Sequence, residues 1–173
     1  MMTETQALEP KVKNAYSSIL PNRTLGKLVL NAMEELYPVH FSSDEIIYAA
    51  EFSEIVHGTC QTYNDSYDAE PNGVLSATTD FGDVSWVVPS VAFASTCYVN
   101  GTAMHSWDLT AQGKASGAHR GMHTAAKVMF SCLNELYTNP GLLESARKDF
   151  EAALDGQTYQ TMLPEQIHPP KLP

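Results

Sequence analysis

Cysteine is scarce in this chain, and its three cysteines, Cys60, Cys97 and Cys132, are widely separated. They form no C-x-x-C pair, which is the usual element of structural zinc sites and of disulfide-exchange motifs. The first twenty residues are polar and contain no apolar core of a signal peptide. Scattered cysteines in such a sequence are typical of reduced thiols. We therefore expect a cytoplasmic protein.

Basic residues are also few. Ten Lys and Arg stand against twenty Asp and Glu, giving a net charge of −10 with neutral histidines. Lys11 and Lys13 are the nearest approach to a basic patch, and Glu9 offsets them. Binding to phosphate backbones needs clustered Lys and Arg, so the composition argues against a nucleic-acid partner. No apolar run approaches the roughly 18 residues that cross a membrane.

The common catalytic motifs are missing. The sequence contains no G-x-S-x-G nucleophile turn, no G-x-G-x-x-G and no phosphate-binding loop. Cys97 falls in an apolar predicted strand and Cys132 on the buried face of a predicted helix, where thiolates are disfavoured. These absences argue against serine and cysteine nucleophiles and against nucleotide-dependent enzymes. With 43% hydrophobic and 17% charged residues, the chain is nevertheless expected to fold, as one domain.

Four segments have the apolar period of a helix: residues 20–38, 41–58, 118–139 and 140–154. Thr24 is the predicted N-cap of the first helix. Ser42 and Glu45 have the spacing of a capping box at the start of the second, which Gly58 ends. Pro140 suits the first position of the last helix.

Residues 74–78 and 90–99 are rich in Val, Thr, Phe and Tyr and predict two short strands. The expected fold is therefore α/β, with few strands flanked by about four helices. We divide the chain into a polar N-terminal segment (1–15), an α/β body (16–158) and a proline-rich surface tail (159–173). Two strands make a poor sheet alone, which indicates part of a larger fold.

Histidines are the first candidates for chemistry. His105 has no other His or Cys at metal-ligand spacing, so it is either an ordinary structural residue or one ligand of a site completed elsewhere. His119 and His123 lie four residues apart, as in the zinc-binding H-E-x-x-H helix. Arg120 replaces the glutamate of that motif, and its positive charge disfavours a metal. We favour a packed or exposed helix start for this pair.

The stretch TTDFGDVSW, residues 78–86, is the second candidate, because loops at strand ends often carry function. Asp80 and Asp83 can orient a ligating histidine or hold a substrate. They can equally cap a turn through their own backbone. Spacing alone leaves both interpretations open.

Six motifs follow one another along the chain: YSSILPNRTLGKLVLNAM, FSSDEIIYA, TTDFGDVSWVVPSV, GTAMHSW, TAQGKASGAHRGM and AAKVM. This series resembles the C-terminal part of amidohydrolases of the aminoacylase and glutamate-carboxypeptidase type, a superfamily of metallopeptidases. The resemblance is strongest to the branch formed by the B subunits of aminobenzoyl-glutamate hydrolases. It covers most of residues 16–165, and TDFGDVSWVVP and HSW…QG…AHRGM are its specific motifs.

The resemblance implies a two-metal hydrolase that uses zinc or manganese and cleaves the amide bond of an N-acyl amino acid such as aminobenzoyl-glutamate. The histidine of the HS motif, the last metal ligand of the family, falls on His105. The residues that contact substrate or orient the ligands would come from a small set: Thr79, Asp80, Asp83, Ser85 and Ser106.

In the family, the N-terminal half of the chain supplies the other metal ligands and the catalytic glutamate, and this sequence has no counterpart of that half. The chain alone is therefore expected to bind metal weakly and to hydrolyse nothing. A homo- or hetero-oligomer is expected. The alternative is a non-catalytic α/β module, or a subunit that docks onto a partner chain carrying the remaining half.

Overall fold

The structure is a computed structural model that describes residues 12, 14–67, 78–165 and 167. Most of the expected N-terminal segment 1–15, residues 74–77 of the first expected strand, and the end of the expected tail 159–173 lie outside the described residues. None of the described helices is both long and apolar enough to span a lipid bilayer.

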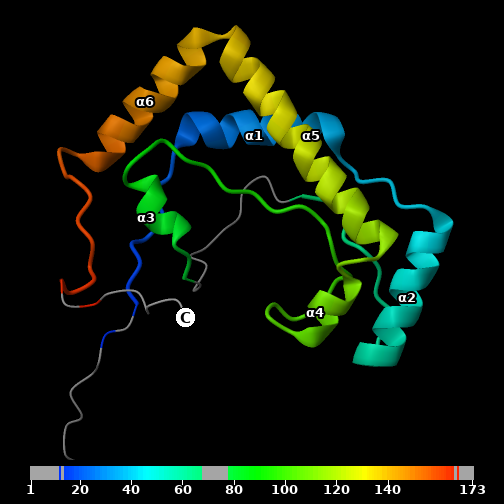
Figure 1. Cartoon of the computed structure of the whole chain (residues 1–173). Helices are drawn as coiled ribbons and strands as arrows, with labels where there is room; N and C mark the ends of the chain where they lie inside the picture. Colours follow the sequence, from blue (N-terminus) through cyan, green and yellow to red (C-terminus); the bar gives the residue numbers. More distant parts are fainter. Residues whose placement is uncertain (1–11, 13, 68–77, 166, 168–173) are drawn as a thin grey trace, which may run out of the picture.

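The described residues form six helices: α1 (Arg23–Leu36), α2 (Ser43–His57), α3 (Phe81–Ser85), α4 (Trp107–Gln112), α5 (Ser116–Thr138) and α6 (Pro140–Leu154). Three of the four long helices, α1, α5 and α6, pack on one another. Figure 1 shows α5 and α6 meeting at an angle with α1 beneath them, and α3, α4 and α2 lie below α1 in this view.

The expected α/β fold is wrong for the described residues, which are helical and contain no sheet. The expected strand at 90–99 is an extended segment, and only Val99 pairs, in an isolated antiparallel bridge with Tyr63. Its side chains alternate: Val91 and Phe93 are half-buried and pack on the helical core, whereas Ala92 and Ala94 are exposed. The segment has the side-chain period of a strand but no neighbouring strand to bond.

Local capping signals predicted the helix ends well. The Ser42–Glu45 capping box forms, and Gly58 ends α2 in the left-handed region at φ 68°. Pro140 begins α6 as predicted. The cap of α1 is different from the prediction, because Asn22 rather than Thr24 accepts the hydrogen bond from the Leu25 N–H, at 3.0 Å.

Thr24 joins α1 to α6 instead. Its backbone N–H and its hydroxyl both donate to the Asp149 carboxylate, each at 2.7 Å, across 125 residues. These bonds lower the pKa of Asp149 below its usual value. The Asn22 side chain adds a buried bond, from Nδ2 to the Ala146 carbonyl at 2.7 Å. The start of α1 is thus fixed to α6 by polar contacts.

Two apolar clusters form the core. The larger one joins α1 to α5, and its buried members are Leu28, Val29, Ala32, Met33, Val128 and Cys132. The smaller one joins α2 to the isolated bridge through Ala49, Tyr63 and Val99, with the Phe41 ring stacked on Tyr63 at 4.4 Å between centroids. The small cluster positions the segment that precedes α4.

The large apolar residues of α5 mostly face outward. Those that are at least half exposed are Met122, Met129, Phe130, Leu133 and Tyr137. The start of α5 instead presents glycines to its neighbours. A Cβ added at Gly121 would overlap the Thr96 carbonyl and crowd the Cys97 sulfur, and one added at Gly117 would overlap the Tyr63 ring. The extended segment therefore lies directly against the backbone of α5.

This close approach makes a stability prediction. Gly121→Ala should lower the free energy of unfolding by about 1–3 kcal/mol, because the added methyl group forces the 96–97 backbone away from α5. The measurement is urea unfolding followed by circular dichroism.

Gly26→Ala is the matched control, since Gly26 lies within α1 and an added Cβ meets nothing within 4 Å. It should raise stability by about 0.5–1 kcal/mol, the usual gain from Gly to Ala in a helix. Equal effects at the two positions would contradict the packing described.

Candidate functional site

His105 lies on the turn that leads from the Tyr63–Val99 bridge into α4. Its side chain is exposed, and its backbone has φ 59°, in the left-handed region. For a residue other than glycine this conformation costs about 1 kcal/mol or more, so the surrounding structure must hold it. Strained residues of this kind cluster at functional sites.

Ser106 holds the C-terminal side of the turn. Its hydroxyl accepts from the Leu109 N–H at 3.2 Å, which caps α4, and donates to the Ala103 carbonyl at 2.6 Å. The Thr110 hydroxyl in turn donates to the Ser106 carbonyl at 3.2 Å. Ser106 was predicted to contact substrate or orient the ligands. Its hydroxyl is engaged in the cap that fixes the residue next to His105.

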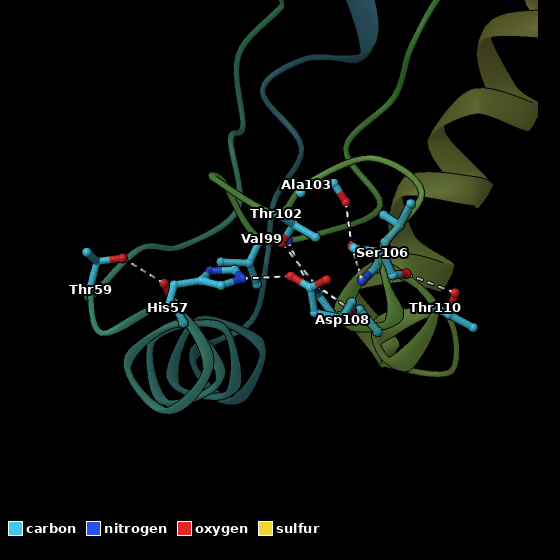
Figure 2. A network of polar contacts seen from close by, with 11 residues as sticks. His57, Thr59, Val99, Thr102, Ala103, Ser106, Asp108 and Thr110 are labelled. Carbon is cyan, nitrogen blue, oxygen red and sulfur yellow. Dashed lines mark hydrogen bonds and ion pairs between the residues drawn. The ribbon is translucent and has the colours of Figure 1, made fainter.

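Asp108 ties α4 to the end of α2. Figure 2 shows its carboxylate facing the His57 ring, with 2.8 Å between His57 Nε2 and Asp108 Oδ2. The Ser106 side chain, followed by the His57 ring, lowers the pKa of Asp108 below its usual value. Nδ1 of His57 is buried and has no partner among the described residues. The pair connects segments 51 residues apart in the sequence.

Gln112 holds the N-terminal side of the turn through a buried side chain. Its side chain is almost completely buried, at 1% exposure. Its Oε1 accepts from the Val99 N–H at 2.8 Å, and its Nε2 donates to the Thr102 hydroxyl at 3.0 Å and to the Asp108 carbonyl at 3.1 Å. The amide thereby joins the start of the 99–112 loop to α4. The loop that carries His105 is held by these hydrogen bonds.

The acidic turn lies in and before α3, which replaces the expected loop. Thr79 and Asp80 are exposed, and Asp80 makes no side-chain cap bond to the helix. Thr79 accepts from the Phe81 N–H at 3.2 Å. The Thr79 hydroxyl and the Asp80 carboxylate are thus on the exposed surface.

Asp83 and Ser85 instead hold the segment that precedes α1. The Asp83 carboxylate accepts from the Ser17 N–H at 2.8 Å, and this bond is the main reason that its pKa is lowered. The buried Ser85 hydroxyl accepts from the Leu20 N–H, also at 2.8 Å. Both bonds join residues that are at least 65 positions apart in the sequence, and both hold the segment before α1 against α3.

The described residues do not bring the two candidate regions together. Figure 1 shows α3 and α4 on opposite sides, and no described hydrogen bond joins the His105 turn to residues 79–85. In the part of the chain that the structure describes, no three His, Cys, Asp or Glu side chains converge as metal ligands. An exposed imidazole on a fixed turn suits one position of a zinc or manganese site, but catalytic zinc needs about three protein ligands. His105 as a ligand stays a prediction.

Sequence reasoning missed His57, Asp108 and Gln112 as parts of this site. The spacing of His57 and Asp108 gives no signal, because they meet only through the packing of α2 beside the Val99 segment. Gln112 is the glutamine of the QG pair in a motif that carries the family resemblance, and this was the only sequence signal that pointed to it.

Comparison with known proteins identifies a relative. No protein-family model matches the chain, and no solved structure matches it. The chain is 30% identical, over an alignment 204 residues long, to the B subunit of p-aminobenzoyl-glutamate hydrolase from Escherichia coli (strain K12), and the match covers 99% of this chain. The chain is a relative of that hydrolase subunit. The resemblance carried by its motifs is confirmed. The chain spans 41% of the length of this relative.

The Asp108 pair makes a prediction on acid stability. Because the folded-state pKa of Asp108 is lowered, its stabilising contribution is present above the unfolded carboxyl pKa of about 3.9 and is lost as the pH falls through the lower folded value. Asp108→Asn should therefore lower the Tm at pH 7. Its Tm should also fall less than that of the original chain between pH 5 and pH 3.

Asp155→Asn is the control, since Asp155 is an exposed left-handed residue after α6, where asparagine is well tolerated. Scanning calorimetry across this pH range compares the three proteins. An unchanged pH profile in Asp108→Asn would show that the pair does not stabilise the turn.

Proposed function

We propose that the chain supplies His105 to a metal-dependent hydrolase that cleaves the amide bond of an N-acyl amino acid such as aminobenzoyl-glutamate. The observation that carries the proposal is the His105 turn itself. An exposed histidine in a costly backbone conformation is fixed from two sides, by the Ser106 cap and by the buried Gln112 amide. The relative named for hydrolysis of p-aminobenzoyl-glutamate supports the reaction class.

A zinc or manganese ion, when bound, would polarise the amide carbonyl and favour ionisation of the attacking water. His105 would be one ligand through an imidazole nitrogen. The Asp108–His57 pair and the Ser106 cap would hold the backbone of the turn that carries His105. The exposed Asp80 carboxylate, beside Thr79, would bind a substrate or orient a second ligating histidine.

The other ligands and a proton-transferring glutamate would come from polypeptide beyond the described residues. Around His105 the surface carries exposed apolar side chains, with Met104 61% and Trp107 70% exposed. Apolar patches of this kind are typical of surfaces that another polypeptide covers. They also favour the second candidate function, a non-catalytic module that docks on a partner carrying the remaining half.

The chain alone should not turn over p-aminobenzoyl-glutamate with added zinc or manganese, because one histidine cannot hold a catalytic metal firmly. The measurement is release of p-aminobenzoate at micromolar protein. Rapid turnover by the purified chain would contradict the need for additional ligands.

A chimera separates the two candidate functions. In it, this chain replaces the matching part of the Escherichia coli relative, and both bound metal and amide hydrolysis are measured. His105→Asn should lower activity at least about a hundredfold and reduce the metal content, since even residues that only orient ligands cost 10–100-fold when lost.

Lys114→Gln, an exposed change just after α4, is the control and should keep both activity and metal. Full metal content and activity in the His105→Asn chimera would contradict the ligand role. The docking module would then be the better interpretation.

A further inference from the structure

We propose that a second site, which binds a small oxyanion through its carboxylate or phosphate group, lies between α2 and the first half of α5. This inference goes beyond the proposed hydrolase, because it involves neither His105 nor α3. The structure has a cavity of about 530 Å³ there. Its lining includes five basic side chains and one carboxylate: His40, His119, Arg120, His123, Lys127 and Glu45.

The single carboxylate in this cavity is already neutralised. Glu45 is 4% exposed, and its Oε2 accepts from Arg120 Nε and from the Ser42 N–H, each at 2.7 Å. Burial raises the pKa of Glu45, but the bonds from Arg120 and Ser42 outweigh it and lower the pKa overall. The ionised Glu45 therefore fixes the guanidinium without leaving a free negative charge in the cavity.

The fixed guanidinium keeps most of its donors. Arginine has five N–H groups, and within the described residues the only side-chain hydrogen bond of Arg120 is the one from Nε to Glu45. The side chain is 43% exposed, so its terminal nitrogens can reach a ligand. A planar guanidinium held by one edge presents the geometry that binds carboxylate and phosphate oxygens in pairs.

One lysine and three histidines, whose N–H groups can donate to an oxyanion, lie around Arg120. His119, His123 and Lys127 follow one another at four-residue steps along α5, so they share one side of the helix, and His40 comes from the loop before α2. None of them forms an ion pair among the described residues. This is a basic cavity on a chain whose net charge is −10.

A metal ion does not fit the same residues. Its nearest histidines, His119 and His123, have no third ligand among the described side chains, and the Arg120 cation lies between them in the sequence. The Glu35 carboxylate lines the adjacent cavity together with His123 and Lys127, and its negative charge would weaken the binding of an anion by repulsion. Binding in the millimolar range is therefore expected.

The test uses the whole 173-residue chain with two probes, inorganic phosphate and glutarate, at constant ionic strength set with sodium chloride. Histidine ring resonances are followed by NMR. At least one probe should shift the signals of His119 and His123 with a common saturating curve, while His105 stays unchanged. Saturation by phosphate alone would identify a phosphoryl ligand, and saturation by glutarate alone a carboxylate.

Lys127→Gln should weaken the affinity about threefold, the effect expected from one partly exposed charge. Lys148→Gln is the matched control on α6, where Lys148 pairs only with Glu144 among the described residues, and it should change nothing. Far-ultraviolet circular dichroism confirms that both variants fold. No saturable shift with either probe, or equal weakening by the two lysine variants, would overturn the proposal.

Discussion

The buried amide of Gln112 is the interaction on which the candidate site depends. A buried amide that lacked partners would cost a few kcal/mol, so its hydrogen bonds to Val99, Thr102 and Asp108 fix the loop from inside. With the loop closed, α4 has a defined direction and Asp108 can reach His57. The left-handed backbone of His105 persists because the residues on both sides of it are held.

The helices could be predicted because their signals are local. A capping box, a left-handed glycine and an initial proline act within one turn, and Glu45, Gly58 and Pro140 all do what their sequence context indicates. The lack of a sheet among the described residues could not be predicted in this way. Alternation at Val91 and Phe93 describes one face of a segment, whereas a strand also needs a neighbour for its backbone bonds. The described chain supplies that neighbour only at Val99.

The same division applies to the candidate site. The HSW motif located the turn at His105, and the resemblance behind it is confirmed. The acidic turn left two alternatives open, a role toward a histidine or a substrate and a cap of its own turn, and the first of them stays a prediction. The Asp83 carboxylate binds the Ser17 N–H, 66 residues away, a contact that neither alternative foresaw. Contacts at such separation depend on the whole arrangement of helices, which spacing along a sequence does not contain.

Helix α2 connects the two regions of polar chemistry. Its first turn carries Glu45, which is bonded to Arg120 on α5, and its last residue is His57, which is bonded to Asp108 on α4. Between them, Ala49 packs in the small cluster with Tyr63 and Val99. A helix of 15 residues is about 22 Å long, so the two pairs hold opposite ends of α2. The polar pairs at the two ends and the small apolar cluster between them together hold the helix.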